Sequence, residues 1–142
     1  MELELTSLEE TKQLAERIAK DIKVGDVIAL YGDLGSGKTT FTKFLVEALG
    51  FDVRVQSPTF IVARKYSKSN GTLSTINHVD LYRMTKEEEV DDIGLEELFT
   101  EPDSITILEW PELAEDKLSS RTVKIKFTLL NEGRKANVQN LH

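Results

Sequence analysis

The clearest chemical pattern in the sequence is a phosphate-binding loop at Gly32–Thr39. Its residues, Gly-Asp-Leu-Gly-Ser-Gly-Lys-Thr, match every fixed position of the pattern G-x-x-x-x-G-K-[ST]. Glycines in such a loop let consecutive backbone N–H groups converge on phosphate oxygens, and the following helix adds the partial positive charge of its N-terminus. In this pattern Lys38 bridges the outer phosphates, and the Thr39 hydroxyl ligates Mg²⁺. The sequence therefore predicts a site for a nucleoside triphosphate.

Two acidic residues come at the ends of predicted strands and are suited to complete this site. Asp80 follows residues 76–79, and Glu109 follows residues 105–108. P-loop enzymes use such an acid to hold Mg²⁺ or to orient the attacking water. Lys38, Asp80 and Glu109 are therefore the candidate catalytic residues, and Thr39, Asp80 and Glu109 are the candidate metal ligands. Either acid alone fits an ordinary strand end as well, and which of them orients water stays open.

The elements that must position these residues follow from the hydrophobic pattern. The capping-box pattern of Ser7 and Glu10 predicts a helix that runs to about residue 22. The apolar run at 27–31 predicts a strand buried on both faces, and the 3.6-residue period over 38–49 predicts a helix that Gly50 ends.

The rest of the chain reads mainly as strands. We expect strands over 60–66, 72–79, 104–108 and 121–130, a hairpin at Asn70-Gly71, one or two short helices near 94–99, and a last strand after a turn at 131–134. Neither an internal repeat nor a linker interrupts this pattern. The prediction is one domain over residues 1–142 with an α/β, P-loop NTPase-like three-layer fold, in which helices flank a mixed parallel and antiparallel sheet.

Composition excludes several classes of protein. The chain has 142 residues, of which 39% are hydrophobic, and it contains no cysteine, which excludes disulfides and thiolate metal sites. No apolar run reaches the roughly 18 residues of a membrane helix. The net charge of −7 argues against DNA binding and against unaided binding of tRNA. We expect a cytoplasmic protein with no membrane contact.

The negative charge is concentrated between Lys86 and Asp103. This segment contains nine acidic residues: Glu87, Glu88, Glu89, Asp91, Asp92, Glu96, Glu97, Glu101 and Asp103. Two interpretations stay open, a solvated helical face and a docking surface for a basic partner.

Two other classes of P-loop protein fit the sequence poorly. A GTPase would carry Asn-Lys-x-Asp, which is absent, and Asp91-Asp-Ile-Gly94 follows three glutamates where a GTPase needs a buried strand. A small-molecule kinase usually needs an arginine-bearing lid, whereas the six arginines of this chain are not clustered in the sequence. A P-loop phosphotransferase nevertheless remains a rival interpretation, as does a binding module in which the nucleotide only sets the conformation.

Further landmarks make the chain resemble the bacterial TsaE family, formerly YjeE, over nearly its whole length. In chain order they are Gly32–Thr40, Ser57-Pro-Thr-Phe60, His78-Val-Asp-Leu-Tyr-Arg83, Gly94-Leu95 and Leu108-Glu-Trp-Pro111. The resemblance implies a small P-loop ATPase, required for threonylcarbamoyladenosine in tRNA, that uses ATP and Mg²⁺ and acts with TsaB and TsaD. Contact with tRNA would be indirect, through that complex.

The resemblance also implies roles for residues outside the loop. It places Thr59 in a switch-like segment near the γ-phosphate, and it places Ser7, Leu8, Gly133 and Arg134 near the base and ribose. The full predicted nucleotide set is Ser7, Leu8, Asp33, Leu34, Gly35, Ser36, Gly37, Lys38, Thr39, Thr40, Thr59, Gly133 and Arg134.

For several of the family's landmark residues a plain structural role is an alternative interpretation. Ser57-Pro58-Thr59 could be an ordinary turn, and His78 could be a satisfied buried histidine. Tyr82 and Arg83 could simply pack and face solvent rather than order the site. Trp110 could pack in the core rather than shape the nucleotide pocket. Hydrolysis by the isolated chain is expected to be slow, because no arginine finger is evident and such a group contributes roughly 10³–10⁵ in rate.

Overall fold

A computed structural model describes residues 1–58 and 62–141. The strands in this part of the chain are β1 Glu2–Leu5, β2 Val27–Tyr31, β3 Ala63–Ser67, β4 Thr75–Asp80, β5 Ser104–Glu109, β6 Val123–Leu129 and β7 Arg134–Gln139. The helices are α1 Leu8–Asp21, α2 Lys38–Ala48, α3 Glu87–Asp91, α4 Leu95–Phe99 and the 3₁₀ helix η1 Pro111–Lys117. None of the helices in this described part has the length and apolar content needed to cross a bilayer.

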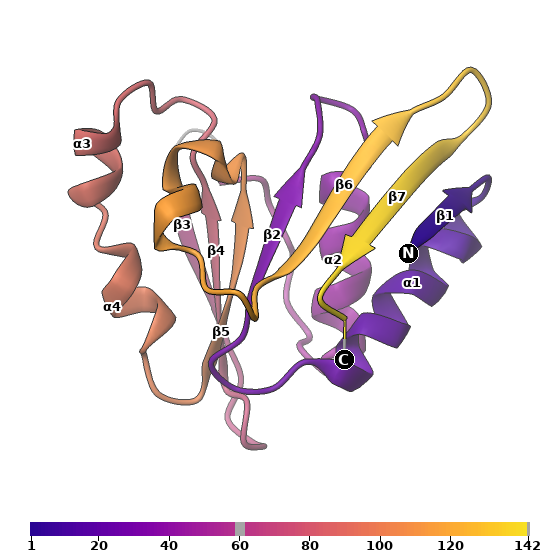
Figure 1. Cartoon of the computed structure of the whole chain (residues 1–142). Coiled ribbons are helices and arrows are strands. Elements are labelled where there is room, and N and C mark those ends of the chain that lie inside the picture. Colours follow the sequence, from indigo (N-terminus) through magenta and orange to yellow (C-terminus); the bar gives the residue numbers. More distant parts are fainter. Residues whose placement is uncertain (59–61, 142) are drawn as a thin grey trace.

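The strands form one sheet in the order β1-β7-β6-β2-β5-β4-β3 (Figure 1). The four central strands β6, β2, β5 and β4 run parallel, whereas β7 and β3 run antiparallel to their neighbours. Strand β2 lies between β5 and β6, and its carboxyl end leads directly into the Gly32–Thr39 loop. Ligands of open α/β sheets bind at this carboxyl edge. The predicted mixed α/β fold is confirmed.

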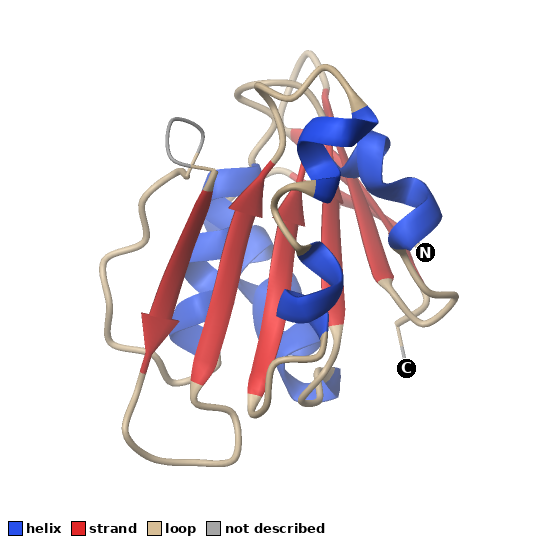
Figure 2. Cartoon of the chain, turned by 90° about the vertical axis from the view of Figure 1, so that its left-hand side faces the viewer, coloured by secondary structure: helices blue, strands red, loops and turns tan. Residues whose placement is uncertain are grey.

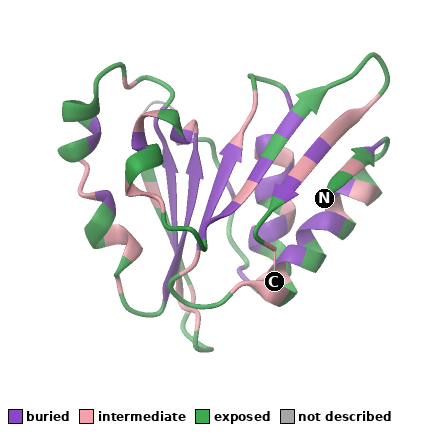
Figure 3. Cartoon of the chain, viewed as in Figure 1, coloured by how far each residue is buried: buried purple, intermediate pink, exposed green. Residues whose placement is uncertain are grey.

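Helices cover both faces of the sheet (Figure 2). Helices α1 and α2 pack on one face in a core that includes Ile18, Phe41 and Leu45. On the other face α3, α4 and η1 pack in a smaller core around Val90, Leu95 and Ala114. Strands β4 and β5 are buried almost throughout, so side chains at their carboxyl ends are held by packing on both sides (Figure 3).

The start of α1 shows how local sequence begins a helix. The Ser7 hydroxyl accepts a hydrogen bond from the Glu10 N–H at 3.3 Å, as the capping box predicts. The Glu10 carboxylate reaches back to the Thr6 N–H at 3.2 Å, one residue before the expected position. The cap therefore also fixes the residue that joins β1 to α1.

Three elements differ from the prediction. The Glu-Leu alternation at the N-terminus forms β1, which pairs with β7 and was not expected as a strand. Helix η1 follows Pro111 where only a strand end was expected. Asn70-Gly71 lies in a longer connection, and β4 begins at Thr75 rather than residue 72, because the Ser74 and Thr75 N–H groups both bind the Asp103 carbonyl. The first residues of the predicted strand 60–66 lie outside the described residues.

Candidate nucleotide-binding site

The Gly32–Thr39 loop has a backbone that requires its glycines. Gly32, Gly35 and Gly37 have φ angles of +136°, +78° and +110°, a region that side chains with a Cβ adopt only with strain. A Cβ on Gly32 would lie 2.6 Å from the Phe127 carbonyl oxygen, which is part of rigid backbone. The glycines therefore allow both the curl of the loop and its close approach to β6.

Lys38 is the first residue of α2 and is only 5% exposed. Its Nζ donates to the Gly32 carbonyl oxygen at 2.5 Å and lies 3.9 Å from the centre of the Trp110 ring. Burial lowers the pKa of the Lys38 ammonium, while the nearby carboxylates of Glu109 and Asp80 act in the opposite direction. The Lys38 side chain thus lies against the backbone of the loop, and its ammonium lies on the face of the Trp110 ring.

Asp80 and Glu109 end neighbouring parallel strands in register with each other. Both are buried, at 2% and 3% exposure, and both lie at the carboxyl edge beside the loop. The Tyr82 N–H donates to Asp80 Oδ1 at 2.8 Å. Together with Lys38 and Thr39, the two acids line a cavity of about 210 Å³. The structure therefore brings together the three candidate catalytic residues and the three candidate metal ligands.

His78 connects this site to the interior. Its Nε2 lies 2.6 Å from Glu109 Oε2, and its Nδ1 lies 3.0 Å from the Tyr66 hydroxyl. The ring is completely buried, so it is a satisfied buried histidine that also touches a candidate site residue. Tyr66 was not singled out from the sequence, because nothing in the local pattern of β3 links it to Glu109.

A second pocket of about 270 Å³ adjoins the first, because Gly37, Thr40 and Arg134 line both. It is also lined by Ser7, Leu8 and Gly133, which come from the two ends of the chain. The structure thus brings all four residues of the expected base and ribose site next to the phosphate loop.

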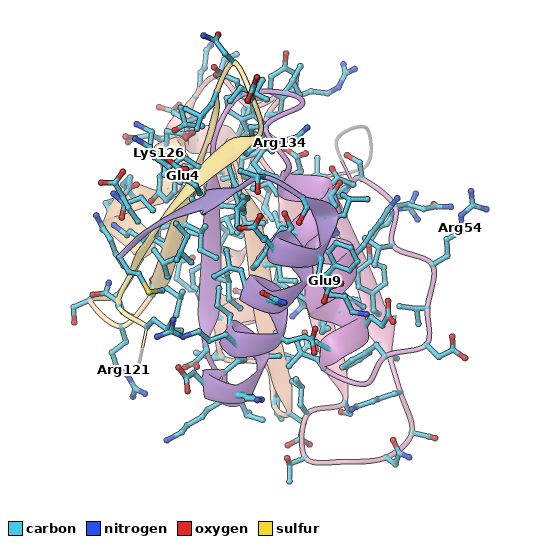
Figure 4. All side chains as sticks on the ribbon, turned by 90° about the vertical axis from the view of Figure 1, so that its right-hand side faces the viewer. Glu4, Glu9, Arg54, Arg121, Lys126 and Arg134 are labelled. Atoms are coloured by element: carbon cyan, nitrogen blue, oxygen red, sulfur yellow. The ribbon has the colours of Figure 1, made fainter. Side chains whose placement is uncertain are left out.

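Arg134 lies directly over the phosphate loop. Its Nη2 donates to the Gly35 carbonyl oxygen at 3.3 Å, and its Cδ lies 2.9 Å from where a Cβ on Gly37 would be. Its Nε is buried and has no partner among the residues that the structure describes. Figure 4 shows Arg134 well apart from Arg54 and Arg121, so the arginines labelled there do not form a cluster.

Some of the predicted nucleotide residues lie elsewhere. Leu34 and Gly35 line the 210 Å³ cavity, but Asp33 and Ser36 line a neighbouring hollow of about 550 Å³ beside β6. Asp33 is exposed, and the Ser36 hydroxyl is buried without a partner in the described part of the chain. Thr59 lies outside the described residues. Ser57, which was not in the predicted set, lines the cavity together with Trp110.

The aromatic residues after the two acids pack against each other. The rings of Tyr82 and Trp110 lie 4.9 Å apart, and Tyr82 is 43% exposed. Trp110 also carries the Lys38 ammonium on its face, so it shapes the cavity as well as packing.

The residues present fit a triphosphate and a hard cation. The curled glycine backbone, the Lys38 ammonium and the Arg134 guanidinium beside the loop suit anionic oxygens. Among the described residues no group of three His, Asp or Glu could hold a metal by itself. Two carboxylates and a threonine hydroxyl suit Mg²⁺, which keeps several waters and shares its shell with phosphates.

Comparison with known proteins identifies the family. The family model described as "Threonylcarbamoyl adenosine biosynthesis protein TsaE" matches residues 5–137. The tRNA threonylcarbamoyladenosine biosynthesis protein TsaE of Bacillus subtilis is 43% identical over 117 residues, which cover 82% of this chain and 70% of that protein. The TsaE protein of Streptomyces coelicolor is 37% identical over 136 residues, which cover 92% of this chain and 90% of that protein.

A solved structure agrees with the sequence relatives. The crystal structure of Bacillus subtilis YdiB matches with a TM-score of 0.77 and 32% identity, and the match covers 100% of this chain and 86% of that one. A family match over residues 5–137 and a shared fold of this extent lead to one conclusion. The chain belongs to the TsaE family of tRNA threonylcarbamoyladenosine biosynthesis proteins.

Proposed function

We propose that this protein binds ATP with Mg²⁺ and hydrolyses ATP as a component of the machinery that makes threonylcarbamoyladenosine in tRNA. One observation carries the proposal: the glycine loop, Lys38 and the buried carboxylates of Asp80 and Glu109 surround one cavity. A loop of this kind binds phosphates through its N–H groups, and a strand-end acid beside it serves the metal or the attacking water. ADP would occupy the same site as the product.

Each part of the site has a role in this proposal. The loop N–H groups and Lys38 bind the phosphates, and the pocket beside Ser7, Leu8 and Gly133 receives the base and ribose. Thr39, Asp80 and Glu109 would hold Mg²⁺, which when bound offsets the negative charge of the phosphates. Asp80 is held by the Tyr82 N–H, so its carboxylate is oriented before any ligand binds.

Slow hydrolysis by the isolated chain is part of the proposal. Arg134 is the one arginine among the described residues that line the 210 Å³ cavity, and its Nη2 is bonded to the loop itself at Gly35. An arginine placed on the transferring phosphate contributes roughly 10³–10⁵ in rate. We propose that the TsaB–TsaD complex supplies the missing acceleration and that tRNA is reached only through that complex. A cytoplasmic location fits a role in tRNA modification.

The proposal is tested by reconstitution with γ-labelled ATP, purified TsaB and TsaD, tRNA and the activated threonylcarbamoyl donor. We expect label in free phosphate, a rate that rises on adding TsaB–TsaD, and modified tRNA that depends on this chain. Label on a protein or small-molecule acceptor would instead support a phosphotransferase.

The variants Asp80→Ala and Glu109→Ala separate hydrolysis from a purely conformational role. We expect both variants to lose ATP turnover. Without turnover they should also fail to support repeated cycles of tRNA modification. Full support of modification without turnover would favour a nucleotide-gated binding module. Retained turnover in both variants would contradict the assignment of these two acids.

A further inference from the structure

A chain of hydrogen bonds runs along one face of the sheet and ends at Glu109. It links the Tyr66 hydroxyl to His78 Nδ1 at 3.0 Å and His78 Nε2 to Glu109 Oε2 at 2.6 Å. The three residues are 6%, 0% and 3% exposed, so water does not compete for these groups. A buried polar chain of this kind is costly unless each member is satisfied, and here each one is.

The sheet register explains why three strands meet in this chain. Tyr66 on β3 pairs with Ile76 on β4, and Glu109 on β5 pairs with Asp80 on β4. His78 lies two residues from each of these β4 positions, so all these side chains share one face of the sheet. Diagonal neighbours across adjacent strands are within reach of long side chains.

The chemistry of the groups gives the chain a direction. An ionised carboxylate only accepts hydrogen bonds, so His78 Nε2 must carry the proton that points at Glu109. The Tyr66 oxygen lies 3.0 Å from Nδ1, and it also lies 3.2 Å from the Gln56 carbonyl oxygen and 3.4 Å from the Gln56 N–H. Burial raises the pKa of the Tyr66 hydroxyl, which keeps this donor protonated at neutral pH.

We propose that Tyr66 and His78 are positioning residues for Glu109. Tyr66 holds the imidazole ring at Nδ1, and His78 fixes Glu109 through Oε2 and leaves Oε1 as the oxygen for the metal. This inference rests on the proposed function, because Glu109 needs a fixed orientation only if it serves Mg²⁺ and ATP. Removing a group that orients a metal-binding carboxylate typically costs 10- to 100-fold in metal affinity or activity.

The test compares the affinity for AMP-PNP, an ATP analogue that is not hydrolysed, with Mg²⁺ and with EDTA. The dissociation constant with EDTA divided by the dissociation constant with Mg²⁺ measures the contribution of the metal. We expect His78→Leu to lower this ratio about 10- to 100-fold and to leave the metal-free affinity unchanged. His78→Gln, whose amide N–H can replace Nε2–H, should restore most of the ratio. Tyr66→Phe removes the hydroxyl that contacts Nδ1 of His78 and should also lower the ratio.

A spectroscopic readout tests the contact with Glu109 without any nucleotide. The chain has two histidines, so the imidazole nitrogens of His78 can be assigned by NMR. We expect the Nε2 proton of His78 to exchange slowly with solvent in the wild type and faster in Tyr66→Phe. An Nε2 that carries no proton in the wild type would overturn the proposed chain.

Asn77→Leu is the matched control. Asn77 is the neighbouring buried polar residue on β4, it points to the opposite face of the sheet, and it accepts from Lys65 at 2.8 Å. We expect Asn77→Leu to lower the melting temperature and to leave the ratio of dissociation constants unchanged. If the wild type binds AMP-PNP more tightly with Mg²⁺ but His78→Leu shows the same ratio, the positioning role is wrong and the proposed function stands. If the wild type shows no Mg²⁺-dependent binding, both fail.

Discussion

Lys38 is the side chain on which triphosphate binding depends most directly. Its ammonium is buried and bonded to the loop backbone, so it is already held at the place where the outer phosphates are expected. Its N–H groups can donate to phosphate oxygens in place of the Gly32 carbonyl oxygen without a change in the loop backbone. The aromatic face of Trp110 beneath it keeps the side chain from moving away from the cavity.

We expect Lys38→Ala to weaken ATP binding at least tenfold in calorimetry. A hydrogen bond to a charged group contributes about 1.5–3 kcal/mol, and a tenfold change needs about 1.4 kcal/mol. Lys43→Ala is the matched control, because Lys43 is an exposed lysine of the same helix that does not line the 210 Å³ cavity. Equal affinities of the wild type and Lys38→Ala would contradict the phosphate-binding role.

At the scale of elements, the turn before β7 closes the base and ribose pocket against the N-terminal segment. Gly133 has a φ of +77°, and a Cβ there would lie 2.8 Å from the Leu5 carbonyl oxygen and 3.1 Å from the Thr6 Cα. The turn can therefore approach the end of β1 only with glycine at this position. Strand β1 and the start of α1 depend on that approach for their place beside the loop.

We expect Gly133→Ala to destabilise the protein and to weaken nucleotide binding together. The backbone strain contributes about 1–2 kcal/mol, and the collision with β1 adds to it. Gly71→Ala is the matched control, because Gly71 has a φ of +88° but the nearest atoms to an added Cβ, those of the Lys68 side chain, lie 3.7 Å away. Comparing the melting temperatures of the two variants separates the effect of the collision from that of the backbone strain. If Gly133→Ala were no less stable than Gly71→Ala, the close approach would not matter.

Helix η1 is tied to the sheet by Glu115. Its carboxylate accepts from Tyr31 on β2 and from Lys124 on β6, the latter at 3.1 Å. Burial alone would raise the pKa of Glu115, but these two hydrogen bonds outweigh burial and hold the pKa below its usual value of 4.5. A carboxyl whose pKa is lowered by folding stabilises the fold above its unfolded pKa and loses that effect as the pH falls through the folded pKa.

We therefore expect Glu115→Gln to be less stable than the wild type at pH 7 by up to about 1 kcal/mol. The difference should shrink as the pH falls below about 4.5 and vanish below the folded pKa. Denaturant unfolding at pH 7 and at several acidic pH values measures it. A difference that grows toward acidic pH would contradict this sign.

At the scale of the whole molecule, nucleotide binding should stabilise the fold, because the site joins both ends of the chain to the central strand β2. A ligand at 100 times its dissociation constant adds about 2.7 kcal/mol. For a chain of this size we expect the melting temperature to rise by roughly 8 °C with Mg²⁺ and AMP-PNP. Lys38→Ala at the same ligand concentration should show a much smaller rise, and an equal rise would point to another binding site.

The acidic segment 86–103 is partly occupied by internal contacts. Lys117 of η1 bonds Asp91 at 2.8 Å and Glu96 at 3.0 Å, and Glu89 accepts from the Thr85 N–H at the start of α3. Glu87 and Glu88 are exposed. These contacts favour a solvated helical surface over a docking surface.

We expect the double variant Glu87→Lys/Glu88→Lys to capture TsaB–TsaD as well as the wild type in a pull-down at physiological salt. The pair leaves the Lys117 and Thr85 contacts intact, so the fold should not change. Loss of capture would instead identify these two glutamates as part of a docking surface.

The phosphate loop and its flanking elements could be predicted from sequence because their causes are local. The positive φ angles of the loop glycines, the buried strand β2 and the periodic helix α2 all arise within residues 27–48. The order of the strands could not be read in this way. The alternation at 2–5 is compatible with several partners, and only the completed sheet selects β7.

The arrangement of the site beyond the loop was decided by tertiary structure. Asp80 and Glu109 were predicted one by one, but their shared register and the Tyr66–His78 contacts behind Glu109 require three particular strands to be neighbours. Arg134 reaches Gly35 across 99 residues of sequence. Side-chain period tells which face a residue occupies, whereas the partner across that face depends on how distant segments pack together.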